Sequence, residues 1–181
     1  RDSVETDDNV LRQTTARLPW LLIGMIGGIG NSMILGNFDS TFAAHPEMAL
    51  YIPLIGGTGG NVGTQSSAII VQGLANSSLD AKNTFKQITK ESVVALINAT
   101  IISLLVYTYN FIRFGATATV TYSVSISLFA VVMFASIFGT LVPMTLEKFK
   151  IDPAIATGPF IAITNDIIGM MLYMGITVLL S

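Results

Sequence analysis

One carboxylate stands inside a long apolar stretch near the C-terminus. The run TGPFIAITNDIIGMMLYMG, residues 157–175, contains Asp166 and no Lys, Arg or His. An isolated ionised carboxylate is costly to bury in apolar surroundings, so it needs a partner. No basic residue lies at a comparable place in any other apolar run. The remaining partners for Asp166 are a proton, a cation or water in a pore.

The neighbours of Asp166 favour a cation. Thr164 and Asn165 flank it, and the small residues Ala162 and Gly169 lie about one helical turn away on the same face. Oxygen ligands suit hard cations such as Mg²⁺ and Ca²⁺, and the chain has no Cys and only one His. We predict that Asp166 binds a hydrated divalent cation, with two chains around an axis supplying two carboxylates. The alternative is a protonated structural carboxyl that is hydrogen-bonded across helices.

A second polar stretch, IGGTGGNVGTQSS at residues 55–67, is rich in glycine. Each glycine weakens a helix by about 1 kcal/mol relative to alanine, so we predict that this segment interrupts its helix and lines a watery cavity. The alternative is a close-packed helix crossing. This stretch and the apolar run at residues 157–175 together supply the residues that we predict to line a pore. They are Gly60, Asn61, Thr64, Gln65, Gly158, Asn165 and Gly169.

The composition predicts an all-α membrane protein. The 181 residues are 51% hydrophobic and 11% charged, and the mean hydropathy is +0.67. Soluble domains are about 25% charged. The apolar runs are long and do not alternate with polar residues, which favours helices over a barrel. The net charge of −2 gives no indication of a nucleic-acid partner. The sequence contains no hydrolase motif and no second carboxylate deep within an apolar run, so it gives no indication of an enzyme.

Five membrane spans are predicted, at residues 18–35, 48–75, 92–114, 121–146 and 153–180. Residues 1–17 form a separate connecting segment, in which Asp7, Asp8 or Asn9 could cap a short helix. Pro159 is expected to interrupt the last span. Eight of the nine basic residues fall on one side of this layout and only Arg113 on the other. This bias predicts a multi-pass plasma-membrane protein with a cytoplasmic N-terminus and an outside C-terminus.

Two motifs, PLIGGTGGNVGTQSSAIIVQGLA and DPAIATGPFIAITNDIIGMMLY, together with the five-span layout, resemble the membrane domain of MgtE magnesium channels. The likeness covers most of the chain from Arg17 onward. It implies a homodimer of five-helix subunits with a central pore lined mainly by the second and fifth spans. It also implies that Asp166 binds a largely hydrated Mg²⁺, with the backbone carbonyl of Ala162 nearby. The family motif has Asn where Gly158 stands here.

The resemblance also implies a function for each part of the chain. Residues 18–181 would form a channel domain for Mg²⁺ influx down the electrochemical gradient, and residues 1–17 a plug-like connecting segment. We expect the family's cytosolic regulatory domains to be absent from this chain, so that gating by cytosolic Mg²⁺ is absent or weakened. The alternative is a proton-coupled secondary transporter with Asp166 as the proton carrier, since broken helices at mid-membrane are also typical of that class.

Overall fold

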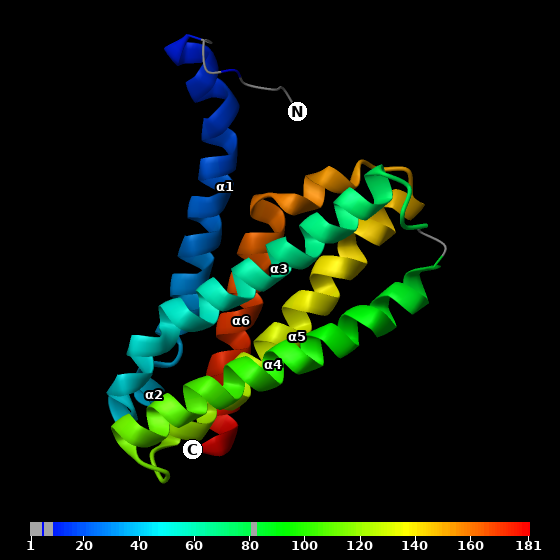
Figure 1. The fold of residues 1–181 in the computed structure, drawn as a ribbon. Coiled ribbons are helices and arrows are strands. Elements are labelled where there is room, and N and C mark those ends of the chain that lie inside the picture. The colour runs from blue at the N-terminus through cyan, green and yellow to red at the C-terminus, as the bar shows by residue number, and fades with distance from the viewer. Residues whose placement is uncertain (1–4, 6–8, 81–82) are drawn as a thin grey trace.

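The computed structural model describes residue 5, residues 9–80 and residues 83–181 (Figure 1). Two of the predicted caps, Asp7 and Asp8, lie outside the described residues, as do two of the nine basic residues, Arg1 and Lys82. The described residues form helices and no strand, as the composition predicted. In chain order the elements are α1 (Val10–Gly36), α2 (Asp39–Ala44), the 3₁₀ helix η1 (Pro46–Tyr51), α3 (Ile52–Ala75), α4 (Thr84–Phe114), α5 (Thr119–Lys148), the 3₁₀ helix η3 (Pro153–Thr157) and α6 (Pro159–Leu180).

Four helices of the described part, α1, α4, α5 and α6, are long and apolar enough to cross a membrane. The predicted span at residues 48–75 corresponds to η1 and α3. With 24 residues α3 is long enough to cross, but its glycines, amides and hydroxyls leave it outside the set of four. The multi-pass membrane class is therefore supported, and the fifth span stays a prediction.

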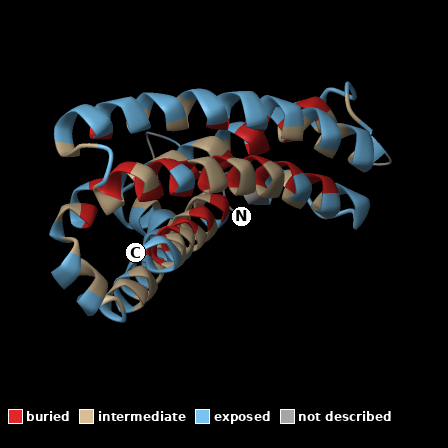
Figure 2. Cartoon of the chain, turned by 90° about the horizontal axis from the view of Figure 1, so that it is seen from below, coloured by how far each residue is buried: buried red, intermediate tan, exposed pale blue. Residues whose placement is uncertain are grey.

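The long helix α5 lies at the centre of the fold. It packs against α3, α4 and α6 and carries the largest set of buried residues. By contrast, much of the surface of α4 is exposed (Figure 2). The main apolar cluster joins η1, α3, α5 and α6 through Met48, Tyr51, Ile55, Val120, Val124, Leu128, Val131, Met170, Tyr173 and Met174. In this cluster the Tyr173 hydroxyl donates to the Met48 carbonyl at 2.8 Å. The cluster fixes where α6 crosses α3.

The first helix leans away from the others and packs mainly on α6 (Figure 1). It has no buried residue. Asn9 caps it, because its side-chain oxygen accepts from the Arg12 N–H at 2.8 Å, which confirms the predicted cap at that residue. The helix then continues across residues 17 and 18, where a boundary between two segments was predicted, and through Pro19.

The predicted interruption of the second span is wrong, because α3 is a continuous α-helix through all its glycines. Some of these glycines lie in contacts with neighbouring helices. Gly59 and Gly63 are buried, and a Cβ at Gly59 would lie 3.0 Å from the Val131 side chain. A Cβ at Gly139 of α5 would lie 2.6 Å from the Gly63 carbonyl oxygen. Close packing against α5 and α6 thus offsets the low helix propensity of glycine.

The last span is interrupted where Pro159 predicted. Asp152 accepts from the Ala154 N–H at 3.0 Å and begins η3 with Pro153 in its first turn. The chain leaves η3 at Gly158, and Pro159 starts α6. Proline suits a first helical position because it lacks the N–H that would be unpaired there. The break places Asp166 about two turns into α6.

Candidate functional site

Asp166 lies half-buried between α1 and α3. On the α1 side, the Asn31 Nδ2 group donates to Asp166 Oδ2 at 3.3 Å. On the α3 side, Gly56 faces the carboxylate, and a Cβ at that position would overlap Asp166 Oδ1. Asp166 makes no ion pair with any residue that the structure describes. The carboxylate is therefore held between a neutral amide and a glycine, with no cationic partner among the described residues.

A hollow of about 360 Å³ opens beside this carboxylate, between α3 and α6. Its lining residues are Gly56, Gly57, Gly60, Asn61, Thr64, Ala162, Ile163 and Asp166. The structure thus brings together five residues singled out in the sequence: Gly60, Asn61, Thr64, Ala162 and Asp166. None of the lining residues is basic, and Gly57 and Asn61 are exposed, so the hollow lies at the surface of the single chain.

Two of the other predicted pore residues lie outside the hollow but near its ends. Gln65 is exposed on α3, one turn beyond Asn61. Gly158 lies at the break before α6, and no atom would lie within 4 Å of a Cβ there. Both positions are open in the single chain.

The remaining two predicted pore residues lie in helix contacts. Asn165 is 1% exposed, its amide lies against Gly63, and neither its Nδ2 nor its Oδ1 has a partner among the described residues. Gly169 is buried, and a Cβ there would lie 3.7 Å from both Ile55 and Val131. In the single chain both residues therefore face neighbouring helices and not the hollow.

Sequence reasoning missed Asn31. The search for a partner of Asp166 considered basic side chains, whereas the partner is a neutral amide. Asn31 reaches the site because Gly27, one turn earlier, allows α1 to approach α6: a Cβ at Gly27 would overlap the Ile163 side chain. The signal in the sequence was a lone amide within the apolar run of residues 18–35.

The residues present suit a hydrated cation better than a dehydrated one. Within the described ranges, no three His, Cys, Asp or Glu side chains lie close enough to hold a metal ion. The half-buried Glu91 belongs to another contact, in which it accepts from the Ser66 hydroxyl at 2.8 Å. Mg²⁺ gives up water reluctantly, so one carboxylate with amide, hydroxyl and carbonyl oxygens nearby fits an ion that keeps its water shell.

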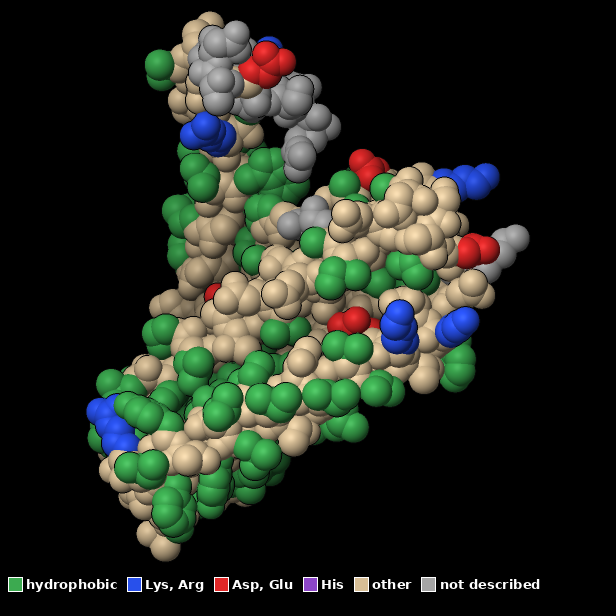
Figure 3. Space-filling model, in the orientation of Figure 1, with side chains coloured by type: hydrophobic (Ala, Val, Ile, Leu, Met, Phe, Trp, Pro, Cys, Tyr) green, Lys and Arg blue, Asp and Glu red, His purple; other side chains and the backbone are tan. Residues whose placement is uncertain are grey.

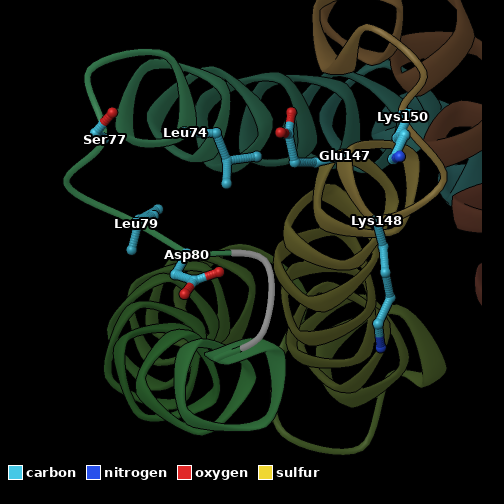
Figure 4. Close-up of a pocket in the computed structure, with 7 residues that line it drawn as sticks. All are labelled: Leu74, Ser77, Leu79, Asp80, Glu147, Lys148 and Lys150. Atoms are coloured by element: carbon cyan, nitrogen blue, oxygen red, sulfur yellow. The ribbon is translucent and has the colours of Figure 1, made fainter.

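A second hollow, of about 600 Å³, lies at the connections that follow α3 and α5 (Figure 4). Its lining residues are Leu74, Ser77, Leu79, Asp80, Glu147, Lys148 and Lys150. Charges of both signs occur there, and the side chains of Glu147 and Lys148 point in different directions. It contains none of the residues that the sequence singled out for ion binding, so Asp166 and its hollow remain the candidate site.

Comparison with known proteins agrees with this chemistry. The model of the MgtE family, described as a divalent cation transporter, matches residues 52–176. The magnesium transporter MgtE of Bacillus subtilis (strain 168) is 32% identical over 160 residues, which are 88% of this chain and 35% of that protein. The magnesium transporter MgtE of Thermus thermophilus is 32% identical over 165 residues, 91% of this chain and 36% of that protein.

A third relative extends the match over nearly the whole chain. The magnesium transporter MgtE of Enterococcus faecalis is 29% identical over 178 residues, 97% of this chain and 38% of that protein. The chain therefore spans a little over a third of the length of the curated relatives it matches.

Proposed function

Because the chain belongs to the MgtE family of divalent cation transporters, we propose that it carries Mg²⁺ into the cell as a homodimeric channel. The family resemblance inferred from the two sequence motifs is thereby confirmed, and the family consists of transporters and not of enzymes. Mg²⁺ is the cargo in this proposal, and Asp166 of each subunit is its binding residue.

The hollow beside Asp166 is the observation that carries the proposal. It gathers a carboxylate, an amide and a hydroxyl, from Asp166, Asn61 and Thr64, beside the glycine backbone of α3. A hydrated Mg²⁺ presents water protons, and all of these oxygens can accept them. The backbone carbonyl of Ala162, which also lines the hollow, adds another acceptor.

A second copy of the chain would balance the charge of Mg²⁺ with a second Asp166 and would enclose the path of the ion. One Asp166 supplies one negative charge, whereas Mg²⁺ carries two positive charges. The hollow lies at the surface of the single chain, beside the exposed residues Gly57, Asn61 and Gln65, which recur every four residues along α3. Two chains that face each other across these residues would enclose a polar pore. In that arrangement α3 is the fifth membrane-crossing helix, with its polar stripe shielded from lipid.

The direction of transport follows from the membrane potential. The negative interior of a cell draws cations inward through a passive channel. A divalent cation gains about 4.6 kcal/mol on crossing 100 mV, so influx needs no coupled ion.

The test is Mg²⁺ uptake into liposomes that contain the Asp166→Asn variant. Asparagine keeps an oxygen that can accept from Asn31 and removes only the charge. We expect uptake to collapse while helix content and oligomeric state stay unchanged. The control is Glu91→Gln, which removes a half-buried carboxylate outside the hollow and should leave uptake near that of the wild type.

Two outcomes would contradict the proposal. Uptake that persists in Asp166→Asn would reduce Asp166 to a structural carboxyl hydrogen-bonded between helices. Uptake by the wild type that requires an imposed pH gradient would instead support the proton-coupled carrier.

A further inference from the structure

We propose that Asn31 of α1 is a positioning residue of the cation site, because it holds the Asp166 carboxylate in the orientation that meets the hydrated ion. This inference rests on the proposed role of Asp166 in binding Mg²⁺. It adds a third helix, α1, to a site otherwise built from α3 and α6.

The contact between Asn31 and Asp166 joins residues 135 positions apart in the chain, at 3.3 Å. It depends on the close approach of α1 to α6 at Gly27 and Ile163. Asp166 Oδ1 lies against Gly56 on the opposite side. With one oxygen bound by the amide and the other confined by α3, rotation of the carboxylate is restricted. A fixed ligand loses less conformational entropy on binding than a mobile one.

The amide oxygen of Asn31, Oδ1, argues against a purely structural role for this residue. Asn31 Oδ1 is buried and has no hydrogen-bond partner among the described residues. Leaving a buried acceptor unpaired is unfavourable, so an apolar side chain of similar size would suit α1 packing at least as well. The feature of Asn31 that a leucine could not reproduce is the bond that it donates to Asp166.

The first experiment uses the purified full chain and its Asn31→Leu variant. Mg²⁺ affinity is measured by titration calorimetry, and the melting temperature is measured without Mg²⁺. Loss of an outer-shell partner weakens metal binding by about 10- to 100-fold, and we expect a loss in that range. The melting temperature should change little, because removal of the unpaired buried oxygen offsets the loss of the hydrogen bond to Asp166. A purely structural role would instead leave the Mg²⁺ affinity intact.

Two further variants complete the test. Ser32→Leu adds the same side chain one residue along, at an exposed position, and should keep the wild-type affinity. Asn31→Ala removes the donor without added bulk and serves if the leucine variant does not fold. It should weaken Mg²⁺ binding in the same way.

The inference and the proposed function can fail separately. If Asp166→Asn abolishes Mg²⁺ binding while both Asn31 variants bind Mg²⁺ as the wild type does, the positioning role is overturned and the site stands. If Asp166→Asn itself binds Mg²⁺ normally, the proposed function fails, and the role of Asn31 fails with it.

Discussion

At the scale of single residues, the partner of Asp166 is informative because it is neutral. A lysine or arginine in the place of Asn31 would neutralise the carboxylate and remove most of its attraction for a cation. The amide donates one hydrogen bond to Asp166 and brings no positive charge to the hollow. In the proposed channel, such a partner would hold the acid in a defined position without competing with the ion.

The contact of Gly56 with Asp166 gives a residue-scale prediction. In Gly56→Ala the added methyl group would occupy the space of Asp166 Oδ1, so the carboxylate must swing away. We expect the half-saturating Mg²⁺ concentration for uptake to rise several-fold. The matched control is Gly57→Ala, where no atom would lie within 4 Å of the Cβ. Equal effects of the two variants, measured by liposome uptake, would show that the contact with Gly56 does not orient the acid.

The sequence could identify Asp166 because it is the lone acid in an apolar run. Ala162 was reached from helical spacing and from the family resemblance, and the structure places it in the hollow. Asn31 could not be found in this way. Its place at the site depends on the packing of Gly27 against Ile163, a contact between distant segments that no local pattern encodes.

At the scale of helices, α3 shows how glycine can both weaken a helix and anchor it. Helical spacing directs Gly59 and Gly63 toward α5 and α6, and Gly57 and Gly60 toward the hollow. Five glycines suggested a break because their intrinsic cost was counted without their partners. The break at Pro159 was predictable, since a proline interrupts a helix regardless of what surrounds it.

The helices α3 and α5 cross at a close contact between Gly63 and Gly139. Gly139→Ala would place a methyl group 2.6 Å from the Gly63 carbonyl oxygen, and backbone cannot yield as a side chain does. We expect a loss of about 1–3 kcal/mol in stability, observed as a lower melting temperature. In the control, Gly175→Ala, the added group meets no atom within 4 Å, so stability should be unchanged or should rise by up to about 1 kcal/mol. A melting temperature that does not fall in Gly139→Ala would mean that this crossing is looser than described.

In the molecule as a whole, the basic side chains are distributed unevenly between its two ends. Basic side chains gather on the N-terminal half of α1 and around the connections that follow α3 and α5, with one basic group at the far end of α4 (Figure 3). Apolar side chains cover much of the surface between them (Figure 3). This distribution supports the proposed orientation, with the connections after α3 and α5 in the cytoplasm.

The absence of cysteine allows a direct test of the orientation. Ala116 lies exposed between α4 and α5, and Ala75 lies exposed at the C-terminal end of α3. In intact cells, a membrane-impermeant maleimide should label Ala116→Cys and should label Ala75→Cys only after permeabilisation. The reverse pattern would invert the proposed topology. Labelling of both positions from outside would mean that α4 does not separate them across the membrane.

The two-sided use of glycine in α3 also bears on how such a chain can diverge over generations. Gly57 and Gly60 face open space, so they can drift toward alanine or serine and alter the width of the hollow in small steps. Gly59 and Gly63 can change only if Val131 and Asn165, which fill their places, change as well. In the proposed channel, substitutions at Gly57 and Gly60 would change the preference among cations while the packing of α3 against α5 and α6 is inherited intact.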